Sequence, residues 1–300
     1  MRISDRFIDN GVVGGFLLAG QFILLALWGL TGWIKPVADF LTVPASVQPA
    51  VNILLAALGI TSIFFFGLFL DLFSTIFPSF VQEEMVILKR HIDHNQWLAE
   101  TIAREDTYFK EGYDDFIDSY NHLPEGENRG LYIGFFHQLI YLTHQVMELL
   151  PRRNKSEKAP QEQKDPKVAY YKLRYFFNSY VLLNSDLPQL DTLTNPEHWW
   201  RASRAICVAT VFWALEPPLV LLIWLVEAVF AQQYLPHFAT VVSFILSWFV
   251  LLLLPFVTLN MTTVAFDHMC HTLFSFTHVT YVKKKSDYSS SVSSPRFTEH

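Results

Sequence analysis

Long apolar runs separated by polar segments dominate the pattern of this chain. Four of them reach the roughly 20 residues that a helix needs to cross a hydrocarbon core about 30 Å thick. The four runs cover residues 12–33, 51–77, 205–230 and 238–259. Few polar side chains interrupt them, among them Gln21, Asp71 and Glu216. The pattern predicts an all-α, polytopic membrane protein with four transmembrane helices.

The polar parts of the chain predict a helical domain between the second and third spans. Within residues 78–204, apolar side chains recur at helical spacing with charged residues on the opposite face. The window 131–150 carries several polar side chains, so we expect a buried or membrane-surface helix there, not a fifth span. Residues 151–166 are charged and poor in apolar side chains, which predicts a flexible linker.

These boundaries divide the chain into four parts. Residues 1–77 hold an N-terminal tail and the first two spans, 78–204 form the helical domain, and 205–262 hold the last two spans. A C-terminal extension covers residues 263–300, and its Ser-rich end, 286–300, is expected to be disordered.

Lys and Arg fall almost entirely on one predicted side of the membrane. Two precede the first span, fifteen lie in residues 78–204 and four follow the last span, whereas Lys35 alone lies between the first two spans. Because cytoplasmic loops are enriched in Lys and Arg, both termini and the helical domain are expected in the cytoplasm. The short remaining loops favour a multi-pass protein of the bacterial cell inner membrane.

The composition agrees with a lipid environment. Hydrophobic residues make up 51% of the chain, charged residues 17%, and the mean hydropathy is +0.25, whereas soluble domains carry about 25% charged residues. A net charge of −6 gives no reason to expect nucleic acid as a partner. Cys207 and Cys270 lie in or beside apolar stretches and do not form a disulfide framework. The expected partners are the lipid bilayer, further copies of the chain and a soluble cytoplasmic protein; the cofactors stay unknown.

Glu216 is the leading candidate for chemistry inside an apolar run. It lies about 18 Å along the third span, near mid-membrane, where a carboxylate is costly unless it is protonated, paired or in contact with water. Pro217 and Pro218 follow it directly and predict a hinge. Asp71 and Gln21 are the candidate companions in an ion or proton pathway. The alternative is a protonated Glu216 that holds two helices together by hydrogen bonds.

Histidine pairs and a glycine pair are the remaining candidates. His91 and His94, like His268 and His271, are one helical turn apart, a spacing from which imidazoles could hold iron or zinc. The adjacent His-His pairs of membrane desaturases are absent, and the alternative is ordinary surface or core histidines. Gly11 and Gly15, four residues apart, predict close helix packing or self-association.

The motifs of common enzymes are missing from the sequence. It contains no P-loop, dinucleotide fingerprint, Gly-x-Ser-x-Gly or Cys-x-x-Cys, so we expect a protein that is not an enzyme. The first hypothesis is a homo-oligomeric ion- or proton-conducting channel or transport component with a cytoplasmic gating or docking domain. The alternatives are a membrane anchor or scaffold that recruits a soluble partner, and a histidine-rich membrane metalloenzyme.

Overall fold

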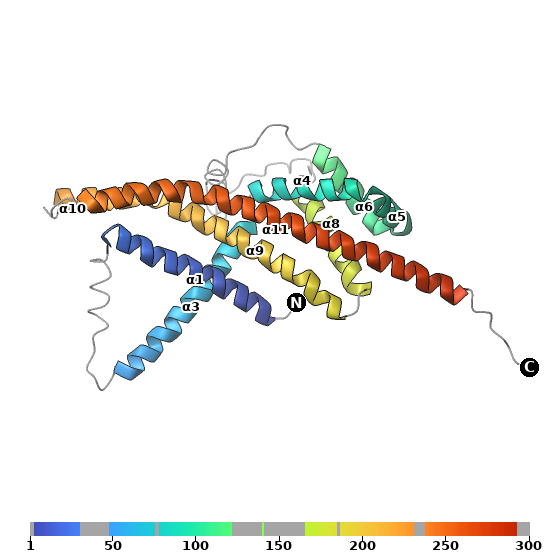
Figure 1. Ribbon diagram of the computed structural model, residues 1–300, viewed down its shortest axis with the longest axis horizontal. Coiled ribbons are helices and arrows are strands. Elements are labelled where there is room, and N and C mark those ends of the chain that lie inside the picture. Colours follow the sequence, from blue (N-terminus) through green and yellow to red (C-terminus); the bar gives the residue numbers. More distant parts are fainter. Residues whose placement is uncertain are drawn as a thin grey trace, which may run out of the picture. The chain divides into compact units, whose positions relative to one another are not determined.

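The computed structural model describes residues 3–30, 48–75, 78–121, 140, 166–184, 187–230 and 238–292. Throughout these ranges the regular structure is helical and no strand occurs, which confirms the predicted all-helical class for this part of the chain (Figure 1). The helices are α1 (Ile3–Leu27), α3 (Gln48–Thr75), α4 (Pro78–His94), α5 (Gln96–Glu105), α6 (Thr107–Asn121), α8 (Pro166–Asn184), α9 (Leu187–Leu215), α10 (Pro217–Phe230) and α11 (Phe238–Val292).

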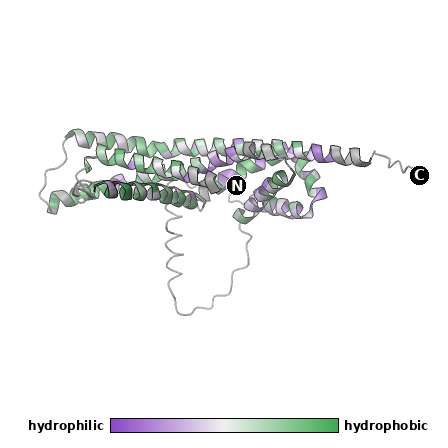
Figure 2. Ribbon diagram, turned by 90° about the horizontal axis from the view of Figure 1, so that it is seen from below, coloured by the Kyte–Doolittle hydropathy of each residue, from purple (hydrophilic) through white to green (hydrophobic). Residues whose placement is uncertain are grey.

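Four helical stretches are long and apolar enough to cross a membrane. They are Asn10–Leu27 in α1, Val51–Thr75 in α3, Thr194–Val226 through α9 and α10, and Phe238–Ser286 in α11. The last one, 49 residues long, exceeds what a bilayer requires. Along α11 the colouring changes from mainly hydrophobic near its start to more hydrophilic toward its end (Figure 2). Each of the four predicted spans therefore overlaps with one of these helical stretches, residues 31–33 and 76–77 lie outside the described part, and the orientation of the spans stays a prediction.

Several predicted segments fall outside the described residues. They are the window 131–150, apart from Ile140, and the linker 151–166, apart from Pro166. The helix α11 continues to Val292, so the first residues of the C-terminal end that was expected to be disordered are helical. Residues 293–300 lie outside the described part.

The chain divides into two compact units. The first comprises Met1–Phe77 and His198–Thr262, and the second comprises Pro78–Glu197 and Thr263–His300. Both α9 and α11 therefore contribute residues to each unit.

In the first unit, α1 and α3 cross with their backbones in contact (Figure 1). A Cβ atom placed on Gly14 would lie 1.7 Å from the carbonyl oxygen of Ile63, and one on Gly67 would lie 1.8 Å from that of Asn10. Every residue other than glycine carries a Cβ, so these two positions accept glycine alone at this helix spacing. Small residues that let backbones approach closely are typical of helix packing in membranes.

An aromatic cluster holds the remaining helices of the first unit to α1. Trp28, Trp213 and Phe244, from α1's end, α9 and α11, are buried together. The Trp28 indole donates a 2.8 Å hydrogen bond to the Ser247 hydroxyl. Gly29, with φ +69°, ends α1 directly after this tryptophan, a left-handed conformation that glycine adopts without strain. The cluster fixes α9 beside the polar residues of α1.

The second unit packs around aromatic side chains. Helix α6 buries Phe109 and Phe116 on one face, and Phe177 of α8 contacts both Phe109 and Phe274 of α11, with ring centroids 5.3 and 4.7 Å apart. Tyr170 of α8 is likewise fully buried. Because the named residues of α6 and of α8 are seven positions apart, two helical turns, each of these helices presents one apolar stripe to its neighbours.

Candidate functional site

Glu216 occupies the break between α9 and α10. Its backbone N–H donates to the Phe212 carbonyl at 3.1 Å, and its own carbonyl accepts from Leu219 at 2.8 Å and Val220 at 3.2 Å. Pro217 and Pro218 have no backbone N–H, so they cannot continue the helical hydrogen-bond pattern beyond Glu216. The break that interrupts this apolar stretch thus lies at the acidic residue, and the local sequence causes it.

Gln21 of α1 contacts this carboxylate. Its amide Nε2 donates to Glu216 Oε2 at 3.0 Å, and both side chains are half-buried. A glutamine amide carries both donors and an acceptor, so it can hydrogen-bond a carboxylate in either protonation state. The structure therefore brings together Gln21 and Glu216, two of the three residues that we predicted from the sequence for an ion or proton pathway. We call them the Glu216–Gln21 pair.

A buried tryptophan packs beside the pair. Trp213, one turn before Glu216, is buried, and a Cβ on Gly20 would meet its ring at 2.1 Å, so the tryptophan packs against the α1 backbone beside Gln21. Among the described residues, the buried Trp213 indole nitrogen has no hydrogen-bond partner. Within the pair, the carboxylate is the group that can exchange a proton or hold a cation.

Asp71 lies in the part of α3 that packs against α9. Its neighbours Phe69 and Phe73 both contact Phe212, with centroids 6.4 and 5.6 Å apart, one turn before Glu216. The Asp71 side chain is half-buried. Its part in a pathway stays a prediction.

Arg204, the residue directly before the predicted third span, is buried in the first unit. Its guanidinium donates to the Ser74 carbonyl of α3 and lies over the Trp200 ring at 4.9 Å. Only 2% of the residue is exposed. The Trp-x-x-x-Arg spacing, one helical turn, is the signal that could have indicated this cation–π contact.

Three of the four histidines proposed as metal ligands line one cavity in the second unit. This cavity, about 730 Å³ in volume, lies between α4 and α11, and we call it the α4–α11 groove. His91, His94 and His271 line it, whereas His268 is exposed and is not among its lining residues. In the part of the chain that the structure describes, no group of three His, Cys, Asp or Glu side chains could hold a metal ion. The metalloenzyme hypothesis stays a prediction.

The glycines proposed for packing have different surroundings. A Cβ on Gly11 would lie 2.9 Å from the Phe64 ring, whereas one on Gly15 would have nothing within 4 Å among the described atoms. The tight crossing uses Gly14 and Gly67, which sequence reasoning did not select. A contact of Gly15 with a second copy of the chain stays a prediction.

A buried polar network in the second unit was not foreseen. The Tyr170 hydroxyl donates to the Glu84 carboxylate at 2.8 Å, and Arg174 pairs with Glu197 at 3.1 Å. Burial, with the negative charge of Glu84, raises the pKa of Tyr170 well above its usual range. Burial lowers the pKa of Arg174, but Tyr170 and Glu197 outweigh it and the net pKa is raised. The phenol thus stays a donor and the guanidinium stays charged.

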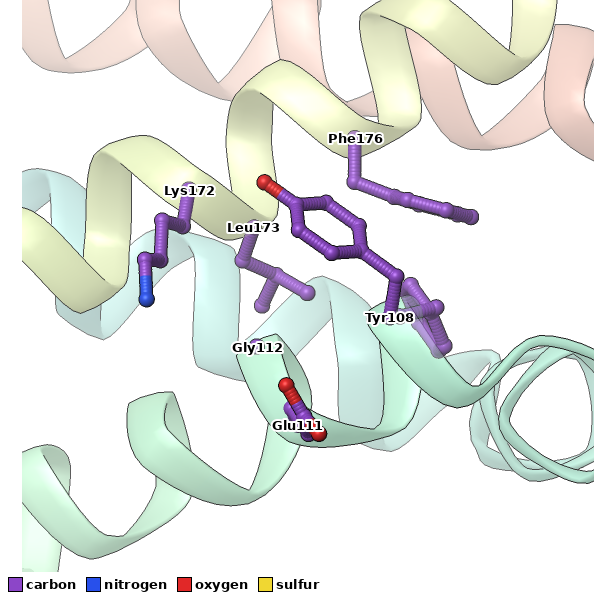
Figure 3. A pocket seen from close by; sticks show the side chains of 7 residues that line it. Tyr108, Glu111, Gly112, Lys172, Leu173 and Phe176 are labelled. Atoms are coloured by element: carbon purple, nitrogen blue, oxygen red, sulfur yellow. The ribbon is translucent and has the colours of Figure 1, made fainter.

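A second, much smaller gap lies between α6 and α8 (Figure 3). Tyr108, Glu111 and Gly112 line it from α6, and Lys172, Leu173 and Phe176 from α8. Its volume is about 10 Å³, which is room for about one water molecule. It is a packing gap and not a ligand site.

Comparison of the chain with known protein families, curated proteins and solved structures found no match. Two places among the described residues could support a function, the Glu216–Gln21 pair in the first unit and the α4–α11 groove in the second.

Proposed function

We propose that the protein is a multi-pass protein of the bacterial cell inner membrane that conducts protons or cations through Glu216. The observation that carries this proposal is the 3.0 Å hydrogen bond from Gln21 to Glu216 at a helix break within an apolar stretch. Ionisable groups inside membrane spans are costly, and they commonly mark ion and proton pathways. Broken helices beside a binding site are a recurring device of transport proteins.

The chemistry of the pair suits a proton carrier. Glu216 can take up a proton in its apolar surroundings and release it again, and Gln21 accommodates both states by using its amide nitrogen or its amide oxygen. No Lys or Arg lies within one turn of Glu216 in the sequence to fix its charge. The break at Pro217 and Pro218 frees backbone carbonyls that could coordinate a cation.

Assembly of several copies is part of the proposal. Only 11% of the apolar window Val51–Thr75 is buried within the chain, and 17% of Asn10–Leu27. These helices therefore have apolar surface for lipid and for further copies, and Gly15 and Gly59 offer open small-residue positions for close approach. In this arrangement Asp71 forms a second polar station, and the second unit acts as the cytoplasmic gating or docking domain.

The test is ion flux through purified protein in liposomes. Wild type, Glu216→Gln and Glu216→Asp are reconstituted, and an internal pH-sensitive dye or a cation electrode follows the decay of an imposed gradient. We expect Glu216→Gln to lose most of the flux and Glu216→Asp, which keeps the carboxylate, to retain part of it. Gln21→Leu, which removes the amide partner, should lower the flux while leaving the chain folded.

Equal flux from wild type and Glu216→Gln, or none from either, would overturn the proposal. In that case, loss of function in cells on deletion of residues 78–204, with Glu216→Gln tolerated, would favour the anchor or scaffold hypothesis. A circular dichroism spectrum of each variant separates loss of conduction from loss of fold.

A further inference from the structure

The α4–α11 groove has the size and polarity of a ligand site. Its volume of about 730 Å³ lies within the range of about 300–1,000 Å³ that small-molecule sites occupy. Its lining combines basic, amide and hydroxyl side chains with the Phe274 ring: Arg90, His91, His94, Asn95, Asp267, His271, Phe274, Ser275, His278 and Val279. The conduction proposal makes no use of this cavity.

The hydrogen-bond donors of the groove favour an anion over a cation. Arg90 and four histidines face one carboxylate, that of Asp267. This carboxylate already accepts from Arg90 Nη2 at 2.6 Å and pairs with His91 Nε2 at 2.8 Å. Asp267 is thus occupied by two basic groups, while the Arg90 guanidinium keeps further N–H donors for a ligand.

The histidines add donors as pH falls. A carbonyl can only accept, so His94 Nδ1 must carry the proton it shares with the Arg90 carbonyl at 3.0 Å, which leaves Nε2 for a ligand. In the described part of the chain, His271 and His278 make no hydrogen bond, and His278 contacts the Trp97 ring at 6.4 Å. Protonation turns both nitrogens of an imidazole into donors and adds positive charge.

The charged side chains beside the groove on α4 and α5 have partners of their own. Lys89 and Asp93, on α4, pair with each other. On α5, Glu105 accepts a 3.2 Å hydrogen bond from Tyr281 of α11. Within the groove itself, Arg90 and Asp267 balance each other, and the four imidazoles supply the remaining nitrogen donors and acceptors.

We propose that the α4–α11 groove binds a phosphate-bearing anion. A phosphate offers several oxygens that accept hydrogen bonds at once, which matches a guanidinium fork and converging imidazoles. The volume leaves room for an organic group attached to the phosphate, against the Phe274 ring. The same chemistry is available from soluble phosphates and from the headgroups of anionic lipids.

Binding is measured on the full-length protein in phosphatidylcholine nanodiscs. Inorganic phosphate is titrated in by calorimetry at pH 6.0 and pH 8.0, and a second arm repeats the titration in nanodiscs that contain 10% phosphatidic acid. We expect saturable binding that is tighter at pH 6.0. Phosphate itself gains a proton between pH 8.0 and pH 6.0. We therefore compare the ratio of the two phosphate affinities in wild type with the same ratio in His271→Gln.

Three variants locate the site. Arg90→Gln and His271→Gln should each weaken phosphate binding by about tenfold or more, since each removes a basic side chain from the lining of the groove. His268→Gln is the matched control, because His268 is an exposed histidine one turn away on the same helix and does not line the groove. It should bind as wild type does. Circular dichroism confirms that each variant is folded.

The outcomes are distinct. Saturable binding of free phosphate, abolished by phosphatidic acid in the second arm, supports the site and points to the lipid headgroup as a competing source. Binding of free phosphate that phosphatidic acid leaves unchanged supports a soluble ligand. The proposal is overturned if neither arm shows saturable phosphate binding. It is also overturned if His268→Gln weakens binding as much as His271→Gln does. None of these results depends on conduction through Glu216.

Discussion

The Tyr170 hydroxyl donates a 2.8 Å hydrogen bond to the Glu84 carboxylate inside the second unit, and neither residue is more than 2% exposed. A carboxylate taken out of water needs such donors, because its hydration is lost on burial. The contact joins α8 to α4. It is therefore a place where a single oxygen atom contributes measurably to stability.

Replacing Tyr170 by Phe removes that oxygen and leaves Glu84 with one donor fewer. We expect the variant to be destabilised by about 1–3 kcal/mol, the usual cost of depriving a buried polar group of its partner. Thermal unfolding of the purified protein in detergent measures the change. Tyr175→Phe is the control, because Tyr175 is 69% exposed and should unfold as wild type does. Equal effects in both variants would contradict the assignment.

The crossing of α1 and α3 predicts a contrast between adjacent glycines. Gly14→Ala should lower stability by about 1–3 kcal/mol or prevent folding, because its methyl group would overlap the Ile63 carbonyl. Gly15→Ala has open space around the new methyl group and should be tolerated. Thermal unfolding midpoints of the two variants in the same detergent are compared. A tolerated Gly14→Ala would show that the helices do not cross at this point.

Gly112 in α6 predicts a stabilising substitution. A Cβ at this position would have nothing within 4 Å, and Gly112 is one of the residues that line the small gap between α6 and α8 (Figure 3). Alanine in place of glycine inside a helix should stabilise the protein by about 0.5–1 kcal/mol through the lower entropy of the unfolded chain. Gly20→Ala, whose methyl group would meet the Trp213 ring, should have the opposite sign. Two changes of the same sign would refute this prediction.

The hydrogen bond from Trp28 to Ser247 predicts a small coupling energy. Trp28→Phe, Ser247→Ala and the double variant form a cycle that isolates the 2.8 Å contact. Hydrogen bonds between membrane helices contribute about 0.6 kcal/mol on average, so we expect a coupling of about 0.5–1 kcal/mol. Unfolding in a denaturing detergent provides the four free energies, and full additivity would mean that the bond contributes nothing.

The apolar helices were predictable because a run of about 20 apolar residues is typical of a helix that crosses a bilayer. The Glu216–Gln21 pair was partly predictable, since polar residues in apolar spans tend to find one another. Which of the adjacent glycines, Gly14 or Gly15, contacts α3 was not predictable. Successive residues of a helix are about 100° apart around its axis, and the sequence does not say which face meets α3. The α4–α11 groove was also hidden, since His91 and His271 are brought together by packing between segments far apart in the chain.

Gly14 and Gly67, where α1 and α3 cross, restrict which substitutions the sequence can accept during evolution. Most clashes in a packed core can be relieved by a smaller side chain on the opposite residue. At Gly14 and Gly67 the opposing atoms are the carbonyl oxygens of Ile63 and Asn10, which every amino acid keeps. No substitution at Ile63 or Asn10 can therefore relieve the clash that a larger residue at Gly14 or Gly67 would cause. A search for revertants of such a variant should recover only the original glycine or changes that move the two helices apart.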